Sequence, residues 1–164
     1  MSSRPRALIA LLELRPHPEG GHYAETFRST NRVSPLDGRQ RRAALTQIYY
    51  LLVRGEHSRW HRVRSDEAWH HYEGDPLELL TLDEDGARVH RTVLGPARAE
   101  DDGARPHCVV PAGVWQAARP LGAYALCGCT VAPGFEFADF AFLAAEAEAA
   151  ARMRAELPEA ALLL

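Results

Sequence analysis

Imidazoles and a carboxylate are concentrated in one short stretch of the chain, residues 55–74. Four of the eight histidines lie in this stretch, together with one glutamate in the middle. Histidine changes charge near neutral pH and is the most common metal ligand, and a neighbouring carboxylate can assist in either role. The stretch therefore predicts a site that transfers protons or binds a metal. Its candidate residues are His57, His61, Glu67, His70 and His71.

His61 and Glu67 form the strongest acid–base pair in the sequence. A neutral imidazole beside a partly buried carboxylate can abstract a proton while the carboxylate orients the ring. This combination favours metal-free epimerisation, isomerisation or dehydration next to a carbonyl group. The structural alternatives are a hydrogen-bonded core histidine, and a buried carboxylate that pairs with Arg62 or Arg64.

The elements that must position these residues are short strands separated by glycine and proline turns. Strands are predicted at residues 22–28, 45–53, 57–64, 67–72, 77–83, 87–94, 107–110, 114–118 and 123–131, with a further segment at 135–140. Helices are predicted only at the two ends, over 6–14 and 143–157, and surface loops at 29–42 and 95–106. This order predicts an all-β antiparallel sandwich or barrel.

The length and composition are typical of one globular domain, with a core over about residues 12–142 of the 164. A net charge of -3 without a basic stripe argues against a nucleic-acid partner. The apolar runs are too short to span a membrane, and the N-terminus lacks a secretory signal, so a cytoplasmic location is expected. All 19 basic residues are arginines, which excludes a lysine Schiff base.

Two motifs resemble those of the cupin superfamily. The spacing of Gly55, His61, Glu67 and Gly74 is similar to the first cupin motif, and the segment 111–116 is similar to the second. Other segments resemble a small single-domain cupin branch labelled as a domain of unknown function. They lie within residues 14–28, 46–52, 58–62, 66–70 and 131–140. The resemblance implies a double-stranded β-helix, or cupin jelly roll, with an internal ligand cavity and a homodimeric assembly.

The chain departs from the metal-binding cupin pattern at two positions. Val63 replaces the second histidine of the first motif, and Gln116 replaces the histidine of the second. Of the usual four ligands only His61 and Glu67 remain, which is a poor set for zinc or a redox metal. We therefore expect no cofactor. If a divalent Fe, Mn, Ni or Zn ion is bound, the resemblance implies His61, Glu67 and Gln116 as its ligands.

Strand alternation leaves some candidates open. If Glu67 points inward, His71 shares its face and His70 does not, unless a bulge reverses the phase. Tyr49 and Tyr50 point to opposite faces of one strand, so at most one reaches a ligand. Cys127 and Cys129 are interpreted as core thiols. The predicted ligand-binding residues are Glu19, Glu25, Tyr49, Tyr50, Ser58, Trp69 and Gln116.

The leading hypothesis is a cupin that binds a small polar metabolite and performs metal-free proton transfer on it, as an epimerase, isomerase or dehydratase does. One alternative is a metal-dependent cupin dioxygenase or isomerase. The other is a ligand-binding or sensor protein without enzymatic activity.

Overall fold

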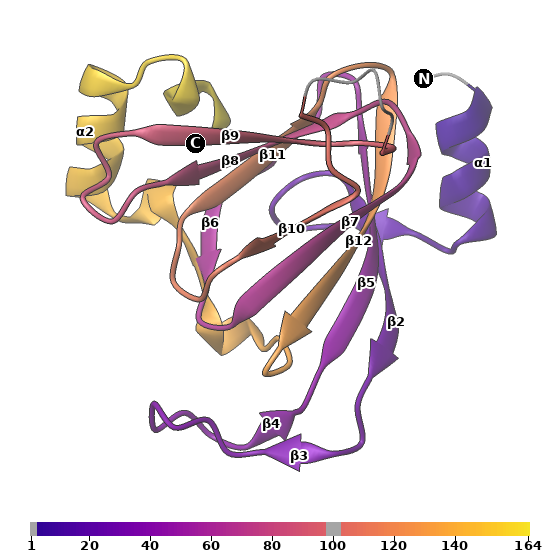
Figure 1. Cartoon of the computed structure of the whole chain (residues 1–164), viewed down its shortest axis with the longest axis horizontal. Coiled ribbons are helices and arrows are strands. Elements are labelled where there is room, and N and C mark those ends of the chain that lie inside the picture. Colours follow the sequence, from indigo (N-terminus) through magenta and orange to yellow (C-terminus); the bar gives the residue numbers. More distant parts are fainter. Residues whose placement is uncertain (1–2, 98–102) are drawn as a thin grey trace.

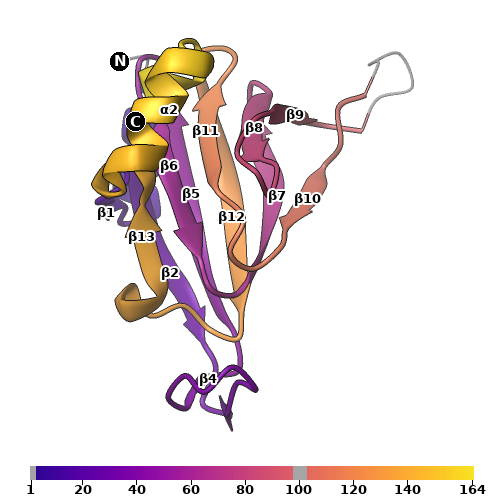
Figure 2. The ribbon, with the colours of Figure 1, turned by 90° about the vertical axis from the view of Figure 1, so that its left-hand side faces the viewer.

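The computed structural model describes residues 3–97 and 103–164, in which two antiparallel β-sheets face each other (Figures 1 and 2). The six-stranded sheet contains, in spatial order, β1 (Arg15–Pro16), β2 (His22–Arg28), β5 (Thr46–Val53), β12 (Tyr124–Ala132), β7 (Asp66–Gly74) and β10 (His107–Val110). The five-stranded sheet contains β13 (Phe140–Phe142), β6 (Ser58–Val63), β11 (Gln116–Pro120), β8 (Leu77–Leu82) and β9 (Val89–Leu94). This arrangement confirms the predicted jelly roll.

The helices lie at the two ends of the chain, as predicted. The helical elements are α1 (Ser3–Leu11), α2 (Ala147–Glu156) and the short 3-10 helices η1 (Phe137–Asp139), η2 (Leu143–Ala145) and η3 (Ala160–Leu163). The first helix starts three residues earlier than the predicted 6–14. No helix in the described ranges is both long enough and apolar enough to cross a bilayer.

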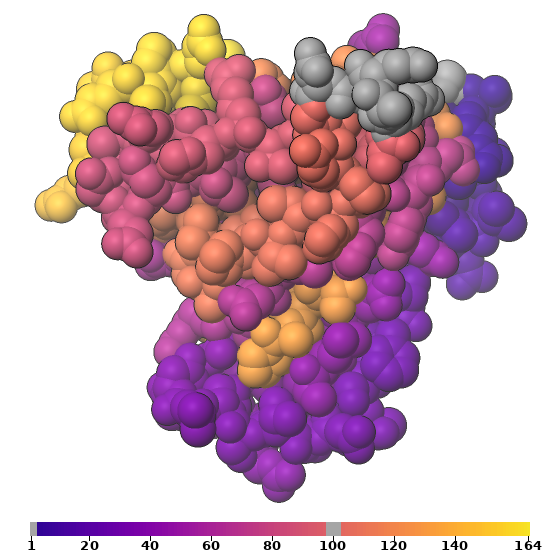
Figure 3. Space-filling view, in the orientation of Figure 1, coloured from indigo at the N-terminus to yellow at the C-terminus, as the bar shows by residue number. Residues whose placement is uncertain are grey.

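Two predicted segments differ in detail from the structure. The predicted loop 29–42 contains a small hairpin, β3 (Arg32–Val33) and β4 (Arg42–Ala43), which projects from the sheets as a lobe (Figures 1 and 3). The predicted strand segment 135–140 is interrupted, because residues 137–139 form η1 before β13 begins. The acidic part of the predicted loop 95–106 lies outside the described residues.

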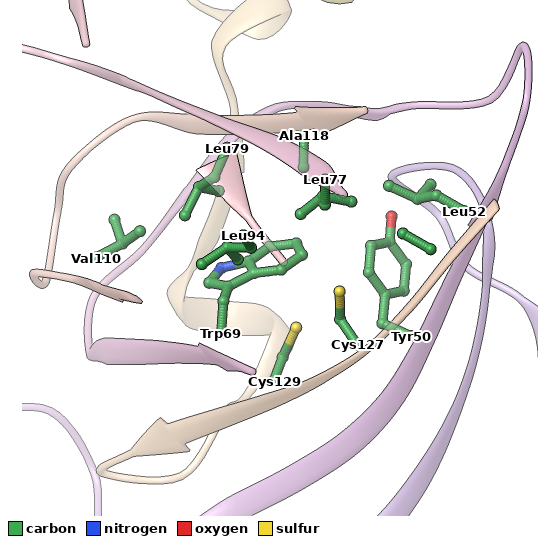
Figure 4. Packing of buried hydrophobic residues seen from close by; sticks show 11 residues of the cluster. Tyr50, Leu52, Trp69, Leu77, Leu79, Leu94, Val110, Ala118, Cys127 and Cys129 are labelled. Atoms are coloured by element: carbon green, nitrogen blue, oxygen red, sulfur yellow. The ribbon is translucent and has the colours of Figure 1, made fainter. Parts of the chain in front are cut away.

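The space between the sheets is filled at one end by an apolar core (Figure 4). Trp69, Leu77 and Leu79 meet there and are 1% exposed, and Cys127 and Cys129 are free thiols that point into the same core. The alternation that favours β-strands directs Leu77 and Leu79 of β8 inward. The neighbouring residues of β8 face outward and pack under α2, so this strand is buried on both sides.

The outer faces of both sheets are partly covered by the terminal helices. Trp60 packs with Met153 and Leu163 on the outer side of the five-stranded sheet, and its indole Nε1 donates a hydrogen bond to the carbonyl of Ala160 at 2.8 Å. On the other sheet, Leu8 of α1 packs against Leu51 at one end of the outer face. The terminal segments therefore contribute to the buried apolar surface.

A β-bulge in β6 decides which of its side chains face inward. Gln116 of β11 pairs with His61 and Ala118 pairs with Ser58, so one residue of β11 lies opposite two residues of β6. The extra residue lets Ser58 and His61 both face the interior while Trp60 points outward. Bulges of this kind are common beside functional sites because they redirect side chains.

Candidate functional site

A cavity of about 300 Å³ lies between the sheets, next to the apolar core. Strands β2, β5 and β12 form one wall, β6 forms the opposite wall, and the segment 135–140 lies at the rim. His61 and Glu67, the predicted acid–base pair, both line this cavity and are 2% and 7% exposed. Glu19 lines it too and is 5% exposed.

The carboxylate in contact with His61 is Glu19. The distance from His61 Nε2 to Glu19 Oε2 is 3.2 Å. On the other side of the ring, His61 Nδ1 lies 2.8 Å from the carbonyl oxygen of Arg59, which only accepts hydrogen bonds. The proton of the neutral imidazole is therefore assigned to Nδ1, so the lone pair of Nε2 faces Glu19 and the cavity.

The turn that carries Glu19 reaches the interior because of a glycine. Gly20 has a φ of 117°, and a Cβ there would overlap the carbonyl oxygen of His57. Without a side chain at this position, the turn lies directly against the start of β6, where Arg59 N donates to the Glu19 carbonyl at 2.9 Å. The side chain of Glu19 then points into the cavity next to His61.

Burial separates the protonation states of this pair. It raises the pKa of Glu19 from 4.5 to about 8, although the nearby hydroxyl groups of Tyr50 and Ser58 act in the opposite direction. Burial also lowers the pKa of His61, and the negative charge of Glu67 only partly offsets this. At neutral pH the shared proton therefore lies on Glu19, and the imidazole is neutral.

Glu67 belongs to a chain of hydrogen bonds across the interior. Trp69 Nε1 donates to Gln116 Oε1 at 3.0 Å, and Gln116 Nε2 donates to Glu67 Oε2 at 2.6 Å. Because an indole only donates, it fixes the orientation of the amide. Burial raises the pKa of Glu67 to about 6, while His61 and Gln116 counteract this rise. Glu67 is therefore ionised at neutral pH while Glu19 is protonated.

The other predicted catalytic histidines lie away from this pair. His70 faces outward and stacks with Tyr72 and His107, at ring-centroid distances of 6.5 and 5.8 Å. His71 Nε2 lies 3.0 Å from the carbonyl oxygen of Asp75. Neither imidazole lines the cavity. The bulge in β7 falls after His71, so it does not reverse the alternation that begins at Glu67.

The predicted ligand-binding residues divide into four groups. Only Glu19 and Glu25 line the cavity itself. Others lie directly behind this lining, because Tyr50 donates to the carbonyl of Gly20 at 2.8 Å and Ser58 contacts His61. Trp69 and Gln116 form the hydrogen-bond chain described above. Tyr49 faces the opposite side of the sheet, where it packs edge-on against Tyr72.

Two neighbours of the central pair were missed by the sequence interpretation. His17 is buried beside Glu19, with Nδ1 3.6 Å from Glu19 Oε1, and burial lowers its pKa to about 4. Phe140 stacks on His61 with a centroid distance of 5.3 Å and an interplanar angle of 19°. His17 lies in the same Pro16–Gly21 signature as Glu19, so its place in that motif was the available signal.

The donor atoms at this site do not suit the metal centre that a cupin fold suggests. Val63 has no donor atom, and both ends of the Gln116 amide already make hydrogen bonds. Within residues 3–97 and 103–164, no group of three or more His, Cys, Asp or Glu side chains is arranged to hold a metal ion. Metal sites in proteins usually require three or four such ligands.

Solved structures of similar sequence cover nearly the whole chain. A hypothetical protein from Leishmania major is 32% identical, with a TM-score of 0.79 over 96% of this chain and 94% of its own. A protein from Shewanella oneidensis is 31% identical, with a TM-score of 0.78 over 96% of this chain and 92% of its own.

A more distant neighbour shares the fold alone. Oxalate decarboxylase from Lactobacillus farciminis is 15% identical, with a TM-score of 0.56 over 79% of this chain and 33% of its own. No curated protein matches the chain. The family model described as "Cupin superfamily (DUF985)" matches residues 6–143. The chain therefore belongs to this cupin family.

Proposed function

We propose that this protein binds a small polar metabolite in the cavity and catalyses metal-free proton transfer next to a carbonyl group. The observation that carries the proposal is the buried group at the cavity wall in which Glu19 contacts His61 Nε2 at 3.2 Å and Glu67 lines the same cavity. Burial raises the pKa values of both carboxyl groups and lowers that of the imidazole. Environments that separate the pKa values of neighbouring groups in this way are typical of acid–base catalysts.

The geometry supports separate roles for the three groups. A substrate carbonyl oxygen that accepts the Glu19 hydrogen bond would free the Nε2 lone pair of His61. His61 would then take the proton from the adjacent carbon, and the electron pair of the broken C–H bond would move onto the oxygen that Glu19 stabilises. The negative charge of Glu67 favours the imidazolium that results. Return of the proton to another face or another carbon would complete an epimerisation or isomerisation.

Hydrogen–deuterium exchange tests this proposal even while the product is unidentified. The protein would be incubated in D2O with a panel of small 2-oxo acids and ketones, and loss of the α-proton signal would be followed by NMR. We expect protein-dependent exchange on at least one member of the panel. His61→Gln should slow it about 100-fold or more while the fold is retained, because general bases contribute about 10²–10⁴-fold.

His90→Gln is the matched control for this test, because His90 is exposed on β9 and lies away from the cavity. It should exchange at the wild-type rate. Exchange by His61→Gln at the wild-type rate, or no protein-dependent exchange across the panel, would contradict the proposal. In the second case a ligand that raises the melting temperature would favour the binding or sensor alternative.

The metal-dependent alternative has its own readout. Stoichiometric Fe, Mn, Ni or Zn in the purified protein, measured by elemental analysis, would favour it.

The predicted homodimer and cytoplasmic location stay predictions. The outer face of the six-stranded sheet supports a subunit interface, since Tyr72 and Val109 are 46% and 49% exposed there.

A further inference from the structure

Two arginines line the cavity, and their surroundings differ. Arg28 pairs with Glu25 at 2.7 Å and with Glu136 at 3.1 Å, so its charge is balanced within the protein. Arg15 lines the same cavity but makes no ion pair with any carboxylate of the described residues. The rim of the cavity thus presents one guanidinium whose hydrogen-bond donors are available to a ligand.

Arg15 is held on the same side of the cavity as the proton-transfer groups. It pairs with Tyr23 across β1 and β2, and its guanidinium carbon lies 4.9 Å from the centre of the Tyr23 ring. That ring packs edge-on against His17 at 4.5 Å, and His17 is next to Glu19. A continuous row of side chains therefore joins the guanidinium at the rim to the His61–Glu19 pair.

The rim also presents an aromatic surface. Phe135, Phe137 and Phe140 line it and pack edge-on, with Phe135 5.1 Å from Phe137 and 6.1 Å from Phe140. Phe137 is 60% exposed, which is unusual for an aromatic side chain that other aromatic rings hold in place. A ligand with an apolar body would cover this surface and gain the corresponding hydrophobic free energy.

We propose that the ligand is a small amphipathic anion. Its carboxylate or phosphate group binds the fork of Arg15, and its apolar body packs against Phe135 and Phe137. The cavity volume of about 300 Å³ is at the lower end of the range for small-molecule sites. The ligand is therefore the size of a simple organic acid. This inference rests on the proposed function for the choice of cavity, and it adds the chemical class of the substrate.

Binding of three matched probes tests the inference independently of turnover. Phenylacetate, phenyl phosphate and the neutral phenylacetamide would each be titrated into the full-length protein at neutral pH by calorimetry. We expect at least one anion to bind about tenfold or more tightly than the amide, because charge-assisted bidentate hydrogen bonds are the stronger ones. The preferred anion distinguishes a carboxylate from a phosphate ligand.

Arg15→Gln should remove this preference, with anion affinity reduced about tenfold and amide affinity unchanged. Arg54→Gln is the control, because Arg54 is an exposed arginine that hydrogen-bonds the carbonyl of Gly122 outside the cavity. It should keep the preference. Equal affinity for acid and amide, undiminished anion binding by Arg15→Gln, or no binding of any probe at millimolar concentration would each overturn the inference.

The two proposals fail in different ways. Anion binding that depends on Arg15, without proton exchange on any substrate, would refute the catalytic role and leave the ligand class intact. Proton exchange that depends on His61 but prefers neutral substrates, with Arg15→Gln fully active, would refute the ligand class alone.

Discussion

Two clusters of buried polar side chains lie in this molecule, and they neutralise their charges in different ways. The first joins the hairpin region to η1: Asp139, 5% exposed, pairs with Arg42 and with Arg39 Nη1 at 3.1 Å. The same Arg39 nitrogen donates to Ser65 at 3.0 Å. The second is the cavity cluster of Glu19, His61 and Glu67, in which Glu19 pairs with the imidazole of His61 and with no arginine of the described residues.

The difference separates a structural role from a chemical one. Buried charges that face opposite charges remain ionised and hold segments together. The cavity groups have no full countercharge, so burial changes their pKa values instead. A cluster that can gain or lose a proton near neutral pH is suited to proton transfer. The Asp139 cluster instead holds the segment 135–140, which carries the phenylalanines at the cavity rim, against the rest of the protein.

The largest expected effect concerns pH and the cavity cluster. Because burial raises the pKa of Glu19 from 4.5 to about 8, the folded protein keeps a proton that the unfolded chain releases above about pH 4.5. The contribution of this group to stability should therefore fall by about 4 to 5 kcal/mol as pH rises from about 4.5 to about 8. Glu19→Gln should remove this loss, as measured by urea unfolding at several pH values.

In that variant stability should instead rise with pH up to about 6.5, because burial lowers the pKa values of His17 and His61, and the raised pKa of Glu67 offsets this rise only in part. Glu84→Gln is the control, since Glu84 is exposed in the turn between β8 and β9, and it should keep the full dependence on pH. If Glu19→Gln lost as much stability as the wild type over this range, the raised pKa of Glu19 would be contradicted.

The next effect tests the ion-paired cluster. Asp139→Asn leaves two arginines without their buried countercharge and should lower the free energy of unfolding by about 3–5 kcal/mol, measured by urea denaturation. Asp37→Asn provides the matched comparison, because Asp37 also pairs with Arg39, at 2.7 Å, but is 43% exposed. It should cost less than about 1 kcal/mol. Equal costs for the two variants would remove the distinction between buried and exposed pairs.

The smallest effect concerns the hydrogen bond that Gln116 donates to Glu67. Gln116→Leu removes the amide that links Trp69 to Glu67, and should cost about 1–3 kcal/mol because both partners stay buried. Since the Gln116 hydrogen bond lowers the pKa of Glu67, its loss should raise that pKa above about 6, as seen by NMR titration. Gln47→Leu, at a half-buried position beside Tyr72, should leave the pKa unchanged. An unaltered Glu67 pKa in Gln116→Leu would contradict the claim that the Gln116 hydrogen bond lowers this pKa.

Local patterns in the sequence predicted an antiparallel sandwich or barrel, and the resemblance to the cupin motifs added the jelly roll and a cavity that holds His61 and Glu67. Alternating apolar and polar residues and turn residues are local signals, and they specify which face of a strand each side chain takes. The alternation rule did not decide whether His70 or His71 shares the face of Glu67, because a bulge between them and Glu67 would reverse the alternation. The structure places the bulge after His71, so the alternation from Glu67 to His71 is not reversed.

Which groups meet depends on the packing of the folded chain. The contact of Glu19 with His61 requires a turn near the N-terminus to pack against β6, and the pairing of Arg39 with Asp139 joins residues 100 positions apart. The pairing of β6 with β11 determines that the Trp60 side chain points outward and the His61 side chain points inward. Such contacts are set by the packing of distant segments and by how deeply they bury each group, and neither quantity is encoded in the local pattern of residues.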